Sequence, residues 1–257
     1  MTTLILTALF SACASGFTFL TGFGLGTVLL PVFLLAMGPA LAVAAVALVH
    51  LFHNLGKFYL LRSHVDRRVL VQFGVPALAA AAVGAWGLTR LSDLPELGTW
   101  TLFGKTFSVC PLRLVIGLSL AVFSGWELRG GGGGIRRVPL WAGGLASGLL
   151  GGLTGHQGAI RSAFFLGKDL PKETFIATGA AVACAVDLTR IAVYGQLFQS
   201  LGGSIPWPVV GAGIAGAAVG LWVGRKSLRH ASVQTFRRII GVALLAFGLG
   251  LAAGVIA

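Results

Sequence analysis

The sequence predicts an all-α polytopic membrane protein made of two inverted repeats of four hydrophobic segments, and three observations lead to this prediction. Of its 257 residues, 56% are hydrophobic and only 10% are charged, which is too little polar surface for a water-soluble globule. Apolar runs of about 20 residues recur, the length of a helix that crosses a bilayer. The second half of the chain also repeats the pattern of the first.

The internal repeat appears when the sequence is shifted by 132 residues against itself. The shift superposes helix-breaking residues, namely Gly26 and Gly158, Pro39 and Pro171, Pro76 and Pro208, and Gly84 and Gly216. We therefore predict an N-terminal repeat over residues 1–128 and a C-terminal repeat over residues 139–257. Five glycines, Gly130 to Gly134, make residues 129–138 a flexible cytoplasmic linker between them.

Each repeat contains four apolar segments, which in the first repeat cover residues 4–37, 40–61, 69–88 and 112–126. The counterparts in the second repeat begin at Leu140. The first segment is longer than one spanning helix and shorter than two. Because Gly16, Gly22, Gly24 and Gly26 interrupt its middle, we expect it to be a broken or re-entrant helix in each repeat.

The distribution of Lys and Arg distinguishes two topologies. If all eight segments cross, the loops on the two sides hold 10 and 6 cations, but if the first segment of each repeat enters and leaves on one side they hold 13 and 3. The second topology satisfies the positive-inside rule far better. Its three crossings per repeat invert the second repeat, an arrangement common in secondary transporters. Both termini would then face the periplasm of a bacterium.

Other features exclude several classes of function. The net charge of +12 lies in short loops between apolar segments, so it does not indicate a nucleic-acid partner. Cys13, Cys110 and Cys184 are expected to be packing residues rather than disulfides or metal ligands. The sequence contains no nucleophile elbow, zinc-protease helix or nucleotide-binding loop. We predict neither an enzyme nor a cofactor, and we expect the first segment to remain in the mature protein.

Four charged residues lie inside the predicted membrane segments: Lys57, Arg161, Asp187 and Arg190. A charge at the bilayer centre costs about 2.5 to 3.5 kcal/mol on insertion scales, so such residues usually face a cavity or a partner. Function is therefore the first hypothesis for them.

Arg161 follows the predicted break of the second repeat, Gly155-His156-Gln157-Gly158. Free backbone N–H groups of a restarting helix, together with an Arg fork, would bind a sulfonate, sulfite or carboxylate. The first repeat offers Thr21, Gly22, Gly24 and Thr27 at its own break. Two such ends facing each other would hold one anion. Close helix packing is the alternative explanation of the glycines.

The second segment of each repeat carries a matched pair of polar residues, Asn54 with Lys57 and Asp187 with Arg190, related by a shift of 133 residues. Each pair shares a helix face because its members are three residues apart. We expect Asn54, Lys57 and Arg190 to contribute to the anion site. Two alternatives stay open at this point: Lys57 could extend toward the interface, and Asp187 with Arg190 could be a neutralising structural pair.

His50 and His53 extend the first pair into a polar stripe. With Asp187 they are candidates for proton coupling, because these groups can titrate as a site opens and closes. Metal binding is the alternative, but no nearby Cys or carboxylate completes a ligand shell.

Three stretches resemble the TauE/SafE family of sulfite exporters and related organosulfur anion transporters: SGFTFLTGFGLGTVLLPVF, VHLFHNLGKFYLLRSHVDRRVL and ASGLLGGLTGHQGAIRSAFFLGKDLPKETFIATG. The resemblance covers nearly the whole chain. It implies an inner-membrane carrier for sulfite, sulfoacetate or similar anions, with inverted repeats and a homodimer as a further implication. The second-repeat motif departs from the commoner glycine run followed by apolar residues and Pro, since it contains His156, Gln157 and Arg161.

The predicted function is thus export of a small anion by alternating access, with membrane lipid as the other partner. An anion channel, a membrane-embedded enzyme and a structural membrane partner are the alternatives. Gly216, Gly220 and Gly224 form a small-residue ridge that would suit helix association in an oligomer.

Overall fold

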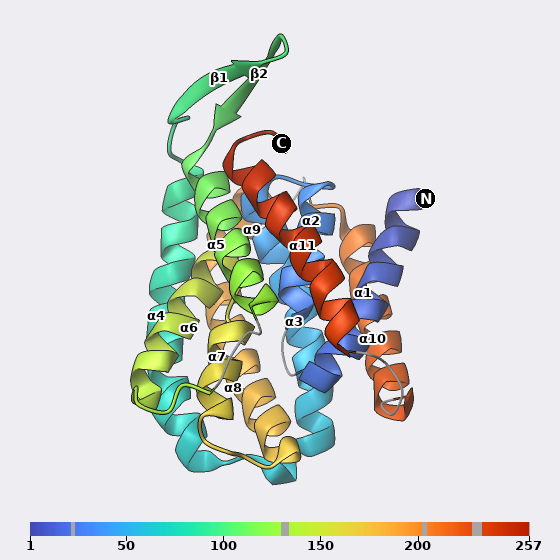
Figure 1. Cartoon of the computed structure of the whole chain (residues 1–257), viewed down its shortest axis with the longest axis vertical. Helices are drawn as coiled ribbons and strands as arrows, with labels where there is room; N and C mark the ends of the chain where they lie inside the picture. Colours follow the sequence, from blue (N-terminus) through green and yellow to red (C-terminus); the bar gives the residue numbers. More distant parts are fainter. Residues whose placement is uncertain (22–23, 130–133, 202–204, 228–232, 257) are drawn as a thin grey trace.

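The computed structural model, which describes residues 1–21, 24–129, 134–201, 205–227 and 233–256, is a bundle of helices with a β-hairpin at one end (Figure 1). The first half contains α1 (Thr2–Thr21), α2 (Leu25–Leu34), α3 (Pro39–Leu61), the short 3₁₀ helix η1 (Arg62–His64), α4 (Arg67–Ser92) and α5 (Pro111–Leu128). The second half contains α6 (Leu140–Thr154), α7 (Gly158–Leu166), α8 (Lys172–Val193), α9 (Gly195–Leu201), α10 (Trp207–Ser227) and α11 (Val233–Ala252).

Among the described residues, 5 helical stretches are long and apolar enough to cross a membrane: Pro39–His64, Arg67–Ser92, Pro111–Leu128, Lys172–Val193 and Trp207–Gly224. Shorter apolar helices include Thr2–Thr18, Leu25–Leu34 and Leu140–Thr154, which belong to the first segments of the two repeats. The chain is therefore an all-α multi-pass membrane protein, and the predicted fold class is confirmed.

Both predicted first segments are interrupted, between α1 and α2 and between α6 and α7. Each break contains a glycine in the left-handed region, Gly24 with φ of 117° and Gly155 with φ of 82°. An L side chain is strained at such angles, so glycine allows the chain to turn there. Gly22, which was predicted to belong to the first break, lies outside the described residues.

The segment α6–α7 leaves the bundle at the end where it entered. Just before α6 begins, the N–H of Ile135 donates to the carbonyl of Ala163 in α7 at 2.9 Å, and Arg136 pairs with Asp169 beyond α7 at 2.9 Å. In Figure 1, α1 starts at the upper end beside the C-terminus, whereas α6 starts from the lower end. This arrangement agrees with the predicted inversion; the boundaries of the two repeats stay a prediction.

Glycines bring two helix pairs into backbone contact. A Cβ at Gly148 of α6 would lie 2.1 Å from the carbonyl oxygen of Ala77 in α4, and one at Gly220 of α10 would lie 2.1 Å from that of Ala12 in α1. The two contacts are equivalent in the two repeats. Each joins the broken first segment of one half to the third segment of the other half. Packing therefore accounts for these glycines.

The ridge Gly216, Gly220 and Gly224 is filled from within the chain. A Cβ at Gly216 would lie 2.2 Å from the carbonyl of Ala8, and one at Gly224 would lie 3.0 Å from Gly16. The suggestion that this ridge supports oligomers is therefore wrong, because α1 occupies it.

Sequence analysis missed two elements. Strands β1 (Gly98–Leu102) and β2 (Lys105–Val109) form an antiparallel hairpin whose Trp100 donates its indole N–H to the carbonyl of Ala253 at 2.8 Å. The turn uses Phe103 and Gly104, both with positive φ, as a two-residue hairpin loop requires. Helix α9 is too short to produce an apolar segment of its own.

Replacing Gly148 by Ala should destabilise the protein by about 1 to 3 kcal/mol, because the new methyl group would overlap a backbone carbonyl that cannot move aside. Thermal unfolding of purified protein in detergent measures the effect. Gly211→Ala is the matched control, since nothing lies within 4 Å of a Cβ at that helical position. Equal melting temperatures for the two variants would contradict the close packing of α6 on α4.

Candidate functional site

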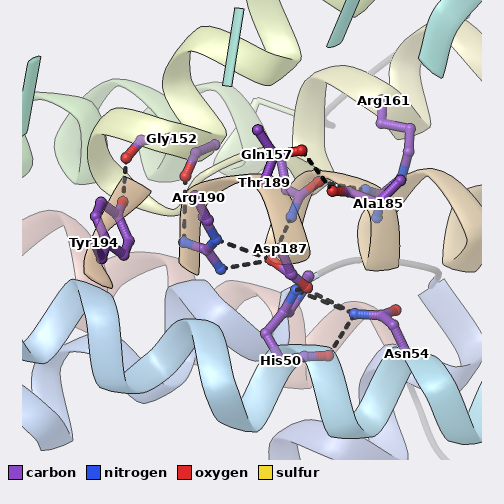
Figure 2. A network of polar contacts seen from close by, with 11 residues as sticks. His50, Asn54, Gly152, Gln157, Arg161, Ala185, Asp187, Thr189, Arg190 and Tyr194 are labelled. Carbon is purple, nitrogen blue, oxygen red and sulfur yellow. Dashed lines mark hydrogen bonds and ion pairs between the residues drawn. The ribbon is translucent and has the colours of Figure 1, made fainter. Parts of the chain in front are cut away.

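A fully buried carboxylate, that of Asp187 on α8, joins three elements at the level of the second break (Figure 2). Its Oδ1 accepts from Nε and Nη2 of Arg190 at 2.9 and 2.8 Å and from the side-chain amide of Gln157 at 3.0 Å. Its Oδ2 lies 2.6 Å from Nδ1 of His50 on α3. Three donors therefore surround Oδ1 and one binds Oδ2, so most of the acceptor capacity of the carboxylate is used.

The partners of His50 define its tautomer. Since a carboxylate only accepts, Nδ1 carries the hydrogen that is donated to Asp187. The amide of Asn54 donates to the backbone carbonyl of His50 at 2.8 Å and lies 3.3 Å from Nε2 of the same ring. Nε2 can accept from that amide, so a neutral His50 satisfies both neighbours.

Three side chains donate to carbonyls near the end of α6, and the carbonyl of Gly151 also accepts from the N–H of Gly155 at 3.1 Å. Arg190 donates Nη1 to the carbonyl of Gly151 at 3.2 Å, and Thr154 donates to that of Leu150 at 3.0 Å. The Tyr194 hydroxyl donates to the carbonyl of Gly152. The guanidinium of Arg190 thus binds both Asp187 and the C-terminal end of α6. The negative end of the helix dipole at that position also favours a cation.

Lys57 makes the corresponding contact in the first repeat. Its ammonium, with the side chain buried on α3, donates to the carbonyl of Thr18 in the last turn of α1 at 3.2 Å. Lys57 and Arg190 are 133 residues apart, and so are their acceptors Thr18 and Gly151. The residue is buried to 2% exposure, so Lys57 does not extend toward the interface. In both halves the second-segment cation binds the end of the broken helix.

Arg161, in the first turn of α7, is buried to 2% exposure and donates Nη1 to the side-chain carbonyl of Gln157 at 3.1 Å. This acceptor is neutral, as is the carbonyl that Lys57 contacts. Arg161 and Lys57 lie within electrostatic reach of each other. Within the described part of the chain, Asp187 is the one buried carboxylate and it is occupied by Arg190 and His50. Among the described residues, neither Lys57 nor Arg161 forms an ion pair with a carboxylate, although the charge of Asp187 acts on Arg161.

The two breaks lie next to each other. A Cβ at Gly26 in α2 would be 3.5 Å from the carbonyl of Gly155 and 3.8 Å from the ring of His50. Gly24 precedes α2, and Gly158 begins α7. Thr27 is half-buried. The side chain of Thr21 and residue Gly22 lie outside the described part of the chain, and the anion site at these breaks stays a prediction.

The remaining two histidines are held by hydroxyl groups. His53 on α3 bonds through Nδ1 to Ser15 at 2.9 Å, and His156 in the second break bonds through Nδ1 to Thr154 at 2.9 Å. The ring of His156 also stacks on Phe123 of α5, with centroids 5.8 Å apart.

Sequence reasoning missed Ser15, Thr18, Thr154, Tyr194 and Phe123. The repeat offered one signal, because Ser15 superposes on Ser147 and both hydroxyls bond to backbone carbonyls, those of Ala217 and Gln157. Within the described ranges, His, Cys, Asp and Glu form no cluster of three or more that could hold a metal ion.

Replacing Asp187 by Asn should cost about 3 kcal/mol or more of stability, because the change leaves the buried Arg190 cation without its carboxylate. The apparent melting temperature in detergent would fall. Asp169→Asn is the control, because it removes a carboxylate from an exposed pair with Arg136. This change should alter the melting temperature little. If Asp187→Asn had the same melting temperature as the wild-type protein, the ion pair would not stabilise the broken segment α6–α7.

Comparison with known families agrees with the resemblance noted in the sequence. The family model described as sulfite exporter TauE/SafE matches residues 6–251. Neither curated proteins nor solved structures give a significant match. The match spans both broken segments and the helices that carry Lys57, Asp187 and Arg190. The chain therefore belongs to the TauE/SafE family of sulfite exporters, which are membrane transporters of sulfite and related organosulfur anions.

Proposed function

We propose that the protein is a secondary transporter that exports sulfite or an organosulfonate such as sulfoacetate across the bacterial inner membrane by alternating access. The observation that carries the proposal is the pair of buried cations, Lys57 and Arg161, whose described acceptors are neutral. A buried charge without a counter-ion is costly, so an anion that enters between them would lower the energy of the site.

The anion binds where the two breaks meet, beside Gly26 and Gly155. Arg161 supplies a planar fork that suits two oxygens of a sulfonate or sulfite, and Lys57 supplies a point charge. The start of α7 adds backbone N–H groups and the positive end of a helix dipole. Gln157 orients Arg161 and is itself held by Asp187.

Arg190 has a positioning role in this proposal. Its guanidinium binds Asp187 and the end of α6, so it fixes the break against which the anion rests. Asn54 in turn fixes the ring of His50. Their direct contact with the anion stays a prediction.

Transport follows from movement of one repeat against the other around the bound anion. Each broken segment packs on a helix of the opposite half, α1 on α10 and α6 on α4. The backbone contacts at Gly148 and Gly220 make these pairs suitable rigid bodies. The second-segment helices α3 and α8 meet at the polar cluster, where binding can be linked to the movement.

Proton coupling is the second part of the proposal. The contact between His50 and Asp187 joins α3 to α8. A proton added to Asp187 would weaken this contact, whereas a proton added to His50 would strengthen it. A change in the imposed pH gradient should therefore alter the rate of exchange.

Replacing Arg161 by Ala should weaken binding of sulfite by about tenfold or more, since a hydrogen bond to a charged group is worth roughly 1.5 to 3 kcal/mol. Arg161→Lys should recover little of the loss because an ammonium lacks the fork. Binding and counterflow of sulfite, measured in proteoliposomes at two imposed pH gradients with sulfoacetate and taurine as competitors, test both variants.

Arg62→Ala is the matched control, because Arg62 is exposed and stacks on Tyr59 outside the cluster. Unchanged sulfite affinity in Arg161→Ala would remove Arg161 from the site. Flux that does not saturate would favour a channel over a carrier.

A further inference from the structure

Two buried histidines present an unpartnered ring nitrogen beside the proposed anion site. Nε2 of His53 and Nε2 of His156 are both buried, and neither has a hydrogen-bond partner in the part of the chain that the structure describes. Each side chain is 2% exposed. Buried polar atoms are nearly always bonded, so two such atoms near one site require an explanation.

The hydroxyl partner of His53 fixes its tautomer. Ser15 has a single hydrogen, which it donates to the carbonyl of Ala217 at 2.6 Å. Its oxygen can therefore only accept from Nδ1 of His53, at 2.9 Å. With the hydrogen on Nδ1, neutral His53 has a bare lone pair on Nε2.

The same logic holds independently at His156. Thr154 donates its hydrogen to the carbonyl of Leu150 at 3.0 Å, and Ser119 donates its own to the carbonyl of Ile116 at 2.8 Å. Both hydroxyl oxygens can only accept from Nδ1 of His156, at 2.9 and 3.4 Å. Nε2 of His156 is then also an acceptor.

Burial and the neighbouring cations both oppose a second proton on either ring. His53 lies one helical turn before Lys57 and feels its charge, and His156 feels that of Arg190. A second proton on either ring would place a cation beside a cation and would leave a buried N–H without an acceptor. Each half of the molecule therefore sets one hydrogen-bond acceptor next to a cation.

We propose that Nε2 of one of these histidines accepts a hydrogen bond from the cargo, so that the transported species is an oxyanion that carries an O–H group. This inference rests on the proposed anion site and narrows its cargo, since it favours hydrogen sulfite over the sulfoacetate dianion, which has no O–H group. Lys57 and Arg161 bind anionic oxygens, whereas a bare imidazole nitrogen repels them and attracts a hydroxyl. An anion without a donor leaves both nitrogens unpaired, and a site with unpaired polar groups discriminates against such a ligand.

The donor has two chemical sources, an acidic proton as in hydrogen sulfite or an alcohol as in a hydroxyalkanesulfonate. The pair 2-hydroxyethanesulfonate and ethanesulfonate tests the alcohol, because the two ions have equal charge and differ by one hydroxyl. Purified full-length protein in nanodiscs should bind the hydroxy compound about tenfold more tightly. In the second arm, the affinities for sulfite and methanesulfonate are measured across the pH range in which sulfite takes up its proton.

If hydrogen sulfite is the recognised form, the affinity for sulfite should rise relative to that for methanesulfonate as the pH falls. Methanesulfonate meets the same charged and titratable groups of the site, so titration of the protein affects both ligands alike. A preference in either arm supports the inference and identifies the source of the donor. No preference in both arms overturns it.

Variants separate recognition from folding. Asn in place of either histidine keeps a donor near the place of Nδ1 and removes Nε2, so His53→Asn and His156→Asn should reduce the preference for the hydroxy compound several-fold. Gln places an amide oxygen near the position of Nε2, and His53→Gln should restore part of the preference. His64→Asn, at an exposed histidine, is the matched control.

The experiments distinguish failure of the proposed anion site from failure of the proposed preference for a donor. If both sulfonates bind with equal affinity and both lose it in Arg161→Ala, the anion site stands and the inference is overturned. If neither binding depends on Arg161, the proposed function fails as well.

Discussion

The hydrogen bonds that end the two broken helices are the constraint on which the rest of the structure depends. A helix that stops inside a membrane leaves backbone carbonyls without partners, and lipid cannot supply any. Here Lys57 binds the carbonyl of Thr18 and Arg190 binds that of Gly151. The two cations supplement the backbone hydrogen bonds at the breaks, and they bring a demand for negative charge into the middle of the protein. The positive charge of the site therefore comes from the side chains that bind carbonyls at the helix ends.

The two halves meet that demand differently. In the second half Asp187 neutralises Arg190, and its remaining lone pairs hold Gln157 and His50. In the first half the residue that matches Asp187 is Asn54, an amide of similar shape without charge. Lys57 consequently has no carboxylate of its own in the described part of the chain. A duplicated fold has thus become electrostatically asymmetric, and the missing charge is what a transported anion can provide.

Much of this could be predicted from the sequence, because the relevant signals are local or periodic. Glycines at the breaks, prolines at the repeat distance and cations in apolar segments mark the broken helices and the polar cluster. The partners of Lys57 could not be predicted, since a backbone carbonyl has no sequence signature and Lys57 could equally have reached the interface. The hairpin was missed because its strands are only five residues long and its one buried anchor bonds to the distant carbonyl of Ala253. The glycine ridge of α10 was assigned to oligomers, because a small-residue pattern does not say which helix fills it.

The hydroxyl-bound histidines show why composition alone cannot define a ligand. A count of His, Ser and Thr would suggest donors and acceptors in equal supply. The structure shows that Ser15 and Thr154 donate their hydroxyl hydrogens to backbone carbonyls. The neighbouring histidine ring must then donate from Nδ1, which leaves its unpartnered Nε2 as an acceptor. Acceptors placed beside cations form a site of mixed polarity, unlike the uniformly positive site that suits a fully deprotonated anion. Specificity in this site therefore depends on where the hydrogens are, as well as on the number of positive charges.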